Sequence, residues 1–420
     1  MGILYNIAFI IFGIFYLPYL VVTRRYKYGM VERLGFLPAR IKDIASKKKI
    51  IWIHAVSVGE MKAASILAPL LRKAFPRHAL VFSSVTHTGN RVARTIATAD
   101  EAVFYLPFDM SFVTTRVTRA VKPDMFLSLE TELWPNLISS LHKSGAKIVL
   151  VNGRISNRSY SRYKNAKIFI SPVLDKFSLI LTQSDRDAVR FLSLGAAKEK
   201  VSVTGNLKFD LPLLGIENKR QEIRSKLDVK DDEILFMAGS THRGEEGIII
   251  DCFAGLKKEY PGLRLFIAPR HVERAAEVES LLSGKGFEPE KVSSVSSPSA
   301  RAVFLLDTVG ELRAMYSAAD IVFVGGSLIK KGGQNPIEPA ILGRPVIFGK
   351  FTFNFHDVVR LFLKNEAAIQ VDNKEELYSA VRFLLDNPKE RKKLGINARD
   401  TISKNTGSSQ RTIEGILSLS

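Results

Sequence analysis

The sequence has few residues of the kinds that form covalent or metal cross-links. A single cysteine, Cys252, occurs among 420 residues. An intramolecular disulfide is therefore excluded, and a reducing compartment is expected. No cysteine and histidine residues have the spacing of a zinc site. The fold must depend on its hydrophobic core, for which a hydrophobic content of 46% is ample. This length predicts two domains.

Acidic residues are also scarce. The chain has 42 Asp and Glu residues against 61 Lys and Arg, so its net charge is +19 and its pI is about 9.8. No acidic residue lies between Glu132 and Asp175, where seven basic residues occur: Lys143, Lys147, Arg154, Arg158, Arg162, Lys164 and Lys167. This excess is consistent with a generally basic surface or with an anionic partner. Because no nucleic-acid-binding module is recognisable, anionic lipid is favoured over nucleic acid.

The first residues form the longest apolar stretch of the chain. Ile3 to Val22 contains no charged residue, and Arg24 and Arg25 follow it. About 20 apolar residues suffice to cross the hydrocarbon core of a membrane, and the basic flank places the rest of the chain in the cytoplasm. A cleaved signal peptide is disfavoured because the charges follow the apolar core. We expect an N-terminal membrane anchor, which either spans the bilayer or inserts into one leaflet, as Pro18 permits.

After this segment, apolar runs of strand length alternate with helical patterns. The expected strands cover residues 49–57, 79–85, 102–106, 125–129, 147–152, 179–182 and 201–204, and then 234–238, 263–268, 302–306, 321–324, 345–348 and 368–371. Helical patterns cover, among others, residues 60–75, 88–99, 111–121, 132–144 and 184–194. Such alternation predicts parallel sheets covered by helices on both faces.

A polar, charged stretch interrupts the alternation and divides the chain. The predicted organisation is an anchor at residues 1–24, an N-terminal Rossmann-like domain at 25–210, a linker at 211–232, a C-terminal Rossmann-like domain at 233–390 and a closing helical segment at 391–420. The predicted fold is α/β, with two Rossmann-like doubly wound domains facing a cleft. This layout resembles the GT-B glycosyltransferases, but epimerases share it, so fold alone does not give function.

One candidate site lies where the first expected strand runs into a helix. The stretch from Ile50 to Glu60 reads as a buried strand, a turn and a helix start. Ser57 and Glu60 have the spacing of a capping box, in which each side chain bonds a backbone N–H of the other. Equally, Glu60 lies just past the carboxyl end of a strand, where ligands bind in open α/β sheets.

Polar loops follow four expected strands of the second half. They cover residues 239–245, 269–271, 307–312 and 325–339, and are rich in Gly, Ser, Thr, His and Arg. Small residues let backbone N–H groups approach a phosphate, and Arg270 can bind its oxygens. Asn335, Pro336 and Glu338 fit a helix start with Asn as N-cap and Pro at N1. Glu338 can also bind a ribose diol. These loops predict a nucleotide site.

The motifs of a retaining mechanism and of a metal site are missing or weak in this sequence. The residue eight positions after Glu338 is Val346, so the Glu-x7-Glu pattern frequent in retaining GT-B enzymes is absent, which favours inversion. The single Asp-x-Asp, Asp185 to Asp187, sits at a helix start and is expected to cap it rather than bind a metal. Glu130 and Glu132 follow another strand. They orient an acceptor hydroxyl or pair with the basic stretch, and Trp134 beside them is expected to pack.

Several motifs together resemble one family. They are His54-Ala55-Val56-Ser57-Val58-Gly59-Glu60, Glu130-Thr131-Glu132-Leu133-Trp134-Pro135-Asn136, Val151-Asn152-Gly153-Arg154, Ala268-Pro269-Arg270-His271, Val309-Gly310-Glu311-Leu312 and Asn335-Pro336-Ile337-Glu338-Pro339-Ala340. With the apolar N-terminus, they resemble the 3-deoxy-D-manno-octulosonic acid (Kdo) transferases of lipid A biosynthesis (glycosyltransferase family 30). The resemblance covers nearly the whole chain.

The resemblance implies an inverting, metal-independent glycosyltransferase without cofactors. It moves Kdo from CMP-Kdo to an anionic lipid A precursor, lipid IVA, in lipopolysaccharide core synthesis. The implied location is the cytoplasmic face of the inner membrane, with its lipids as further partners and no nucleic acid. Glu60 is the implied general base. The implied CMP contacts are Pro269, Arg270, Val309, Gly310, Glu311, Asn335, Pro336, Ile337 and Glu338.

Other functions remain open on the residues alone. A different membrane-associated GT-B transferase would use a UDP-sugar on a lipid acceptor. A nucleotide-sugar epimerase of the same fold would leave the N-terminal apolar segment without a purpose. A non-catalytic basic protein that binds anionic lipid would explain charge and anchor, but would leave the polar strand-end loops unused.

Overall fold

The computed structural model describes residues 5–6, 29–211, 215–294 and 301–419. Apart from Tyr5 and Asn6, the anchor predicted for residues 3–22 lies outside these described residues. Among the residues that are described, no helix is both long enough and apolar enough to cross a membrane. The chain forms two compact units. Unit 1 comprises Met1–Asp210 and Thr406–Ser420, and unit 2 comprises Leu211–Asn405.

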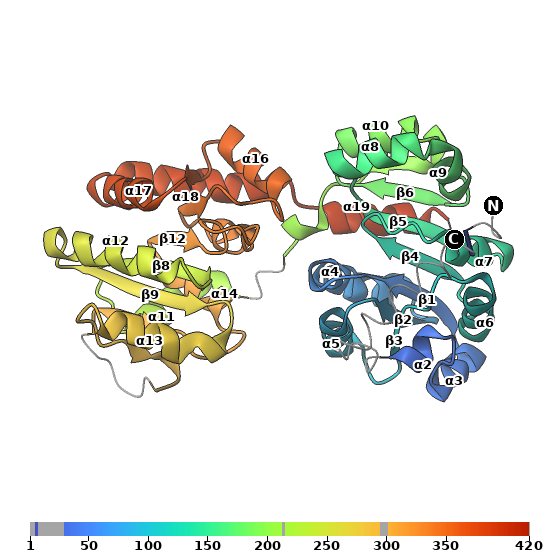
Figure 1. The fold of residues 1–420 in the computed structure, drawn as a ribbon, viewed down its shortest axis with the longest axis horizontal. Coiled ribbons are helices and arrows are strands. Elements are labelled where there is room, and N and C mark those ends of the chain that lie inside the picture. The colour runs from blue at the N-terminus through green and yellow to red at the C-terminus, as the bar shows by residue number, and fades with distance from the viewer. Residues whose placement is uncertain (1–4, 7–28, 212–214, 295–300, 420) are drawn as a thin grey trace. The chain divides into compact units, whose positions relative to one another are not determined.

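Unit 1 is built on a seven-stranded parallel sheet (Figure 1). Its strands are β1 (Lys49–His54), β2 (His78–Ser84), β3 (Ala102–Tyr105), β4 (Met125–Leu129), β5 (Lys147–Gly153), β6 (Leu179–Thr182) and β7 (Val201–Val203). Their order in the sheet is β3-β2-β1-β4-β5-β6-β7. The chain therefore reverses direction across the sheet between β1 and β4, the switch point at which such folds bind ligands.

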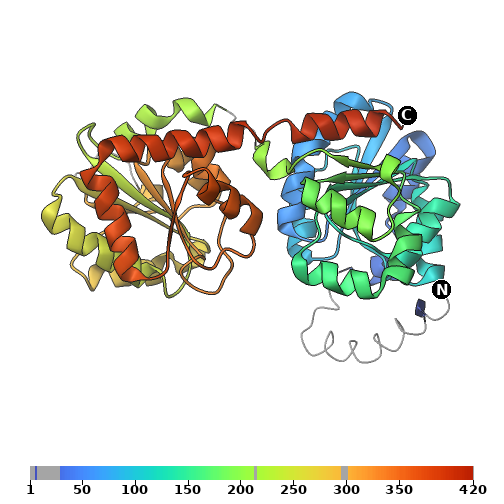
Figure 2. The same cartoon turned by 90° about the horizontal axis from the view of Figure 1, so that it is seen from above.

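Helices cover both faces of this sheet because its strands are apolar on both sides (Figure 2). In β1, Ile50 and Trp52 join one hydrophobic core, and Ile51 and Ile53 join the other. The helices of unit 1 are α2 (Met30–Arg33), α3 (Ala39–Lys47), α4 (Val58–Ala74), α5 (His87–Ile96), α6 (Ser111–Val121), α7 (Pro135–Lys143), α8 (Asn157–Asn165), α9 (Lys167–Leu174), α10 (Asp185–Ser193) and α19 (Ser408–Leu417), with short turns η2 (Lys198–Lys200) and η3 (Leu207–Phe209).

Unit 2 has a second seven-stranded parallel sheet, in the order β10-β11-β9-β8-β12-β13-β14. Its strands are β8 (Ile234–Thr241), β9 (Leu263–Pro269), β10 (Glu290–Lys291), β11 (Val303–Leu305), β12 (Ile321–Val324), β13 (Val346–Gly349) and β14 (Ile369–Val371). Here the switch point lies between β8 and β12. Two Rossmann-like units are thus confirmed, as the sequence predicted.

The helices of unit 2 pack around this sheet over a core of buried aliphatic and aromatic side chains. They are α11 (Arg220–Lys226), α12 (Glu246–Glu259), α13 (Ala275–Ser283), α14 (Leu312–Met315), α15 (Ile337–Ile341), α16 (His356–Lys364), α17 (Lys374–Asp386) and α18 (Pro388–Ser403), with turns η4 (Ile216–Asn218), η5 (Val272–Arg274), η6 (Val292–Ser294) and η7 (Tyr316–Ala318).

The structure draws the domain boundaries differently from the sequence prediction. Within the segment expected to be a linker, 211–232, helix α11 belongs to unit 2. Arg220 and Arg224 bind the carboxylate of Asp320 at 2.6 and 2.9 Å, which fixes this helix. The expected closing segment, 391–420, is divided between the units. Helix α18 lies in unit 2, whereas α19 returns to unit 1.

Candidate functional site

The turn between β1 and α4 holds Glu60 in the first turn of the helix. Ser57 is the N-cap, and its hydroxyl accepts the N–H of Glu60 at 3.3 Å. The Glu60 carboxylate accepts the N–H of Val56 at 2.6 Å and the Ser57 hydroxyl at 2.9 Å. The Ser57 N–H also acts on this carboxylate, as predicted, and Val56 adds a donor one residue further back. Ser57 caps the helix as predicted, and the same interaction orients the candidate base.

The neighbouring strand β2 braces this turn. Ser84 and Thr86 donate their hydroxyls to the carbonyl of Val56 at 3.0 and 2.9 Å. His54, the last residue of β1, is fully buried and lies 2.9 Å from the Ser83 hydroxyl through Nδ1. Burial lowers the pKa of His54 to about 3, against the opposing effect of its bond to Ser83. His54 is therefore neutral and structural, so the histidine of the motif is not an acid or base here.

Two further carboxylates follow β4 on the other side of the switch point. Glu130 has a left-handed backbone, with φ of 55°, and its N–H bonds the carbonyl of Val151 at 2.9 Å. Its carboxylate binds the ammonium of Lys208 at 3.2 Å. The alternative that Glu130 forms an ion pair is thus realised, with Lys208 in η3 as a partner.

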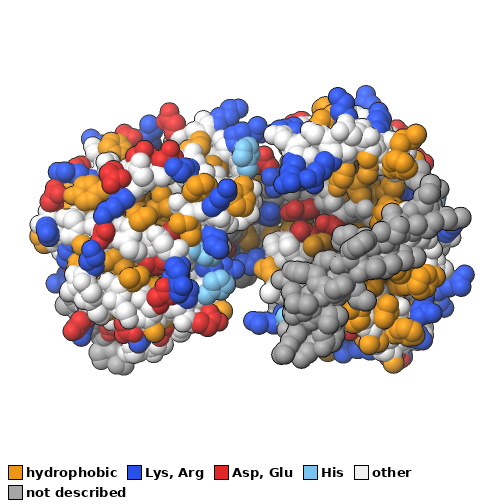
Figure 3. Space-filling model, in the orientation of Figure 1, with side chains coloured by type: hydrophobic (Ala, Val, Ile, Leu, Met, Phe, Trp, Pro, Cys, Tyr) orange, Lys and Arg blue, Asp and Glu red, His pale blue; other side chains and the backbone are white. Residues whose placement is uncertain are grey.

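Glu132 is held in an environment that disfavours its charge. Burial, followed by the negative charges of Glu60 and Glu130, raises the pKa of Glu132 to about 8. Burial and the charge of Glu130 likewise raise the pKa of Glu60, although bonds from Val56 and Ser57 oppose the shift. At neutral pH, Glu132 is then mostly protonated beside a Glu60 that is more basic than an ordinary carboxylate. Figure 3 shows a small group of acidic side chains on this unit, bordered by Lys and Arg.

This arrangement suits proton abstraction. Glu60 is held by two hydrogen bonds and is only partly buried, so a hydroxyl group can approach the carboxylate. A general base works best when its pKa is near the pH of the reaction, and a raised pKa brings the carboxylate closer to that value. The cluster combines a base, a neutral acid and an ion pair at one switch point, which is the pattern expected of a catalytic site.

In unit 2, the predicted nucleotide contacts follow β9 and β11. Pro269 ends β9 and is buried, whereas the next side chain, Arg270, is exposed. After β11, Val309 is 82% exposed, and Gly310 has a φ of 96° that favours glycine. Glu311 precedes α14, and its carboxylate accepts the hydroxyl of Thr308. These residues present a polar, accessible edge, with Arg270 as its cation.

The remaining predicted contacts surround the start of α15. The Asn335 amide oxygen accepts the N–H of Ile337 at 3.1 Å, and its amide nitrogen donates to Glu338 at 3.2 Å. Pro336 is the N-cap residue of α15, so the helix begins one residue later than predicted, with Asn335 before it. Ile337 is fully buried, so it offers a ligand neither its side chain nor its N–H. Asn335 and Glu338 remain half-buried and available.

The structure joins the loops after β11 and β12. The charge of Glu338 influences both Arg313 in α14 and Tyr316 in η7, which places the start of α15 beside the β11 loop. The sequence motifs did not single out His242, which follows β8, or Gln334, which belongs to the β12 loop. The Gln334 amide nitrogen lies 3.1 Å from Nε2 of His242, whose ring is 6.0 Å from that of His271. In the sequence, the only indication of these two residues was that each lies in a loop that follows an expected strand.

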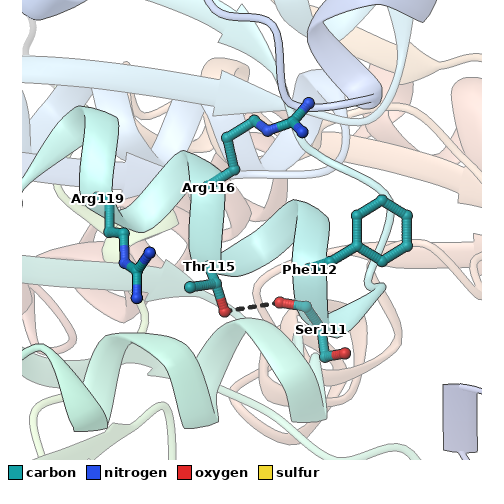
Figure 4. A pocket seen from close by; sticks show the side chains of 5 residues that line it. All are labelled: Ser111, Phe112, Thr115, Arg116 and Arg119. Carbon is teal, nitrogen blue, oxygen red and sulfur yellow. Dashed lines mark hydrogen bonds between the residues drawn. The ribbon is translucent and has the colours of Figure 1, made fainter.

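A pocket of about 530 Å³ lies away from these strand ends, on α6 (Figure 4). Its lining residues are Ser111, Phe112, Thr115, Arg116 and Arg119. Phe112 is 64% exposed, and the guanidinium of Arg116 lies 4.7 Å from the ring centroid of Phe36. Because the described lining consists of arginines, hydroxyl groups and an exposed ring, the pocket suits an anionic amphiphile rather than acid–base chemistry.

The basic stretch of unit 1 forms two short consecutive helices, α8 and α9. Arg158, Arg162, Lys164 and Lys167 are exposed on them. Ile168 and Phe169 follow directly and are 74% and 57% exposed. Hydrophobic and basic side chains stand side by side on the surface of this unit (Figure 3). A surface of this composition favours contact with anionic lipid.

Comparisons with known proteins match both halves of the chain. The family model described as 3-Deoxy-D-manno-octulosonic-acid transferase (kdotransferase) matches residues 29–211, and that described as Glycosyl transferases group 1 matches residues 218–401. The 3-deoxy-D-manno-octulosonic acid transferase of Haemophilus influenzae is 37% identical over 94% of this chain and 92% of its own. That of Chlamydophila psittaci is 32% identical over 88% and 84%.

Solved structures resemble the chain in fold. The UDP-GlcNAc 2-epimerase of Neisseria meningitidis, bound to UDP-GlcNAc, aligns with 88% of this chain and all of its own at a TM-score of 0.61 and 14% identity. This likeness shows that the two-unit Rossmann-like architecture is of the GT-B kind.

Proposed function

We propose, from the family of this chain, that it transfers Kdo from CMP-Kdo to lipid IVA with inversion at the anomeric carbon. The chain belongs to the 3-deoxy-D-manno-octulosonic acid transferase family and is a glycosyltransferase of lipopolysaccharide biosynthesis. The relatives are named for transfer of this sugar and match nearly the whole chain.

One observation carries the catalytic part of the proposal: the placement of Glu60 at the β1–β4 switch point. Its carboxylate is oriented by Val56 and Ser57, and its pKa is raised by burial and by Glu130. An inverting transfer needs one base, which takes the proton of the acceptor hydroxyl as the leaving group departs from the opposite face. We assign this role to Glu60, and no step requires a metal ion.

The donor would bind at the strand ends of unit 2. Arg270 supplies an exposed cation for the phosphate, and Val309 and Gly310 supply an accessible loop. Asn335 and Glu338 supply an amide and a carboxylate for ribose hydroxyls. Pro269, Glu311, Pro336 and Ile337 complete the proposed CMP contacts in the same loops. The proposed base belongs to unit 1, and these residues belong to unit 2.

The acceptor and the membrane fit the charge of unit 1. Lipid IVA is anionic, and the exposed basic residues of α8 and α9 and the arginines of the α6 pocket complement it. The apolar segment 3–22 would anchor the chain in the inner membrane, with both units on the cytoplasmic face. This location brings the enzyme to its lipid acceptor.

The test is a choice of donors. Purified full-length protein is incubated with lipid IVA and either CMP-Kdo or a UDP-sugar, and the lipid is analysed by mass spectrometry and by NMR of the new anomeric centre. We expect Kdo on the lipid from CMP-Kdo alone, with the anomeric configuration opposite to that of the donor. Turnover with a UDP-sugar and none with CMP-Kdo would refute the proposed donor, and retention would refute the inverting mechanism.

A further inference from the structure

A buried carboxylate occupies the backbone amides of the glycine loop after β12. Glu245 is fully buried. It accepts the N–H groups of Gly326 at 2.6 Å, and of Ser327 and Leu328 at 2.9 Å each. It also accepts the N–H of His242 at 3.0 Å. Successive backbone N–H groups of this kind normally bind a phosphate. Here the carboxylate of Glu245 occupies these N–H groups. They are therefore not available to a phosphate, although the sequence had indicated that this glycine loop would bind one.

The nearest alternative is a group of side chains at the ends of β8, β9 and β12. It comprises His242 after β8, Arg270 and His271 after β9, and Lys331 after β12. Burial lowers the pKa of His242, and the positive charges of His271, Lys331 and Arg270 lower it further, whereas Glu246 in α12 opposes the shift. The neutral ring accepts the amide of Gln334 through Nε2 at 3.1 Å. Histidine and Lys or Arg side chains lie together on this unit in Figure 3.

Arg270 and Lys331 differ from the neighbouring arginines in their ion pairs among the described residues. Arg243 binds Glu277 at 2.8 Å, and Arg274 binds Glu246 at 2.7 Å. In the part of the chain that the structure describes, neither Arg270 nor Lys331 forms an ion pair with a carboxylate. The excess of positive charge thus stands at the β8–β12 switch point, where the fold binds its ligands.

Packing holds this group in one arrangement. Gly326 has a φ of 70°, and a Cβ atom there would come within 3.2 Å of Cδ2 of His242 and 3.4 Å of the amide nitrogen of Gln334. The Gln334 N–H bonds the carbonyl of Gly325 at 2.9 Å. Glu245 therefore fixes both the loop that carries Gln334 and the backbone of His242.

We propose that His242 and Lys331, with Arg270, form the subsite that binds the phosphate of the donor nucleotide, and that Glu245 is a positioning residue that keeps the phosphate off the β12 amides. The proposal rests on the proposed function and extends it to residues that the family motifs did not indicate. A bound phosphate supplies the negative charge that the cluster lacks. His242 then takes up a proton from solvent and donates to a phosphate oxygen.

The test uses CMP as the probe and the full-length protein. Affinity is measured by calorimetry between about pH 6 and 8.5 for wild type, His242→Gln, Lys331→Gln and the control His356→Gln, which changes an exposed histidine of α16. We expect His242→Gln to weaken CMP binding about tenfold at pH 6, as for loss of a charge-assisted hydrogen bond, and the difference to close by pH 8.5. The ionisation of CMP itself affects all variants equally and cancels in the ratio.

Three further results complete the test. Lys331→Gln should weaken CMP binding at every pH, because it removes the ammonium group from the subsite. Cytidine, which has no phosphate, should bind wild type and His242→Gln equally. Glu245→Gln should lose the pH dependence of CMP binding as His242→Gln does, which a merely structural role would not produce.

Two outcomes separate this inference from the proposed function. If His242→Gln binds CMP with the affinity and pH dependence of wild type while transfer from CMP-Kdo continues, the phosphate subsite is wrong and the function stands. If wild type binds no CMP at any pH, the proposed donor is wrong, and the subsite inference is wrong with it.

Discussion

At the scale of single residues, Glu60 has two roles that need not compete. Its N–H and its carboxylate complete the cap of α4, and the same bonds fix the carboxylate at the switch point. Those bonds stabilise the ionised form, but burial and Glu130 outweigh them, since the pKa of Glu60 is raised overall. The sequence motif indicated both roles, whereas the balance between them depends on burial and on Glu130, which only the fold brings near.

The first prediction concerns Glu132. Its pKa is raised from 4.5 to about 8 in the folded protein, so the folded state binds more protons than the unfolded state between these values. The contribution of Glu132 to stability is therefore fully present below about pH 4.5 and is lost as the pH rises toward 8. Glu132→Gln should remove this loss. Urea unfolding of unit 1 at pH 5 and pH 8 measures it, and an unchanged pH dependence in the variant would contradict the assignment.

The second prediction concerns the cap. Ser57→Ala removes the hydroxyl that accepts the Glu60 N–H and donates to its carboxylate. We expect a loss of about 0.5–2 kcal/mol in the free energy of unfolding, as for other N-caps, together with reduced transfer because Glu60 is less well oriented. Ser57→Thr, which keeps a capping hydroxyl, is the control. Equal stability of the alanine variant and wild type in urea unfolding would argue against the cap.

At the scale of helices and strands, the sequence predicted what local patterns determine. All strands of the first sheet were expected near their observed positions because each is a short apolar run between turn signals. The bounds of helices α8 and α9 were not predicted. In α8 none of the residues is buried, and α9 contains Pro172, so no regular apolar pattern marks where either helix begins or ends. The two-residue strand β10 was also too short to leave a pattern.

The candidate site was predictable to the same extent. Ser57, Glu60, Arg270 and Asn335 lie in motifs at strand ends, and chain order alone places them there. The pair Glu130–Lys208 joins residues 78 positions apart, and Glu245 binds amides 81 to 83 positions away. Such contacts arise from the packing of strands that are not adjacent in sequence, so no local pattern indicates them.

The third prediction tests the return of α19 to unit 1. Ile416 is fully buried in the core beside α4, whereas its neighbour Leu417 is 42% exposed. Ile416→Ala should cost unit 1 about 2–5 kcal/mol through lost burial and the cavity left behind, and Leu417→Ala should cost little. Hydrogen exchange of each unit gives the result. Destabilisation of unit 2 by Ile416→Ala, with unit 1 unchanged, would place the helix in the wrong unit.

At the scale of the whole molecule, the net charge of +19 predicts attraction to anionic lipid. The exposed lysines of α8 and α9 should contribute about 1 kcal/mol each near such a surface. We expect Lys164→Gln with Lys167→Gln to weaken binding to anionic vesicles by roughly tenfold or more, and salt to weaken the binding of wild type. Vesicle flotation measures this.

The matched control changes two exposed lysines of α18 in unit 2, Lys389→Gln with Lys392→Gln, and so lowers the net charge equally. If both double variants lose the same affinity, total charge governs the binding. In that case α8 and α9 do not form a dedicated membrane surface.

The most direct test of the account is the rate of Kdo transfer by Glu60→Gln, measured by mass spectrometry of the lipid product, with CMP affinity measured on the same sample. Glutamine keeps the size of the side chain and a bond to the cap but cannot take a proton. We expect a loss of about 10²- to 10⁴-fold in transfer with CMP binding unchanged. A Glu60→Gln enzyme that transfers Kdo at the wild-type rate would contradict the assignment of the base.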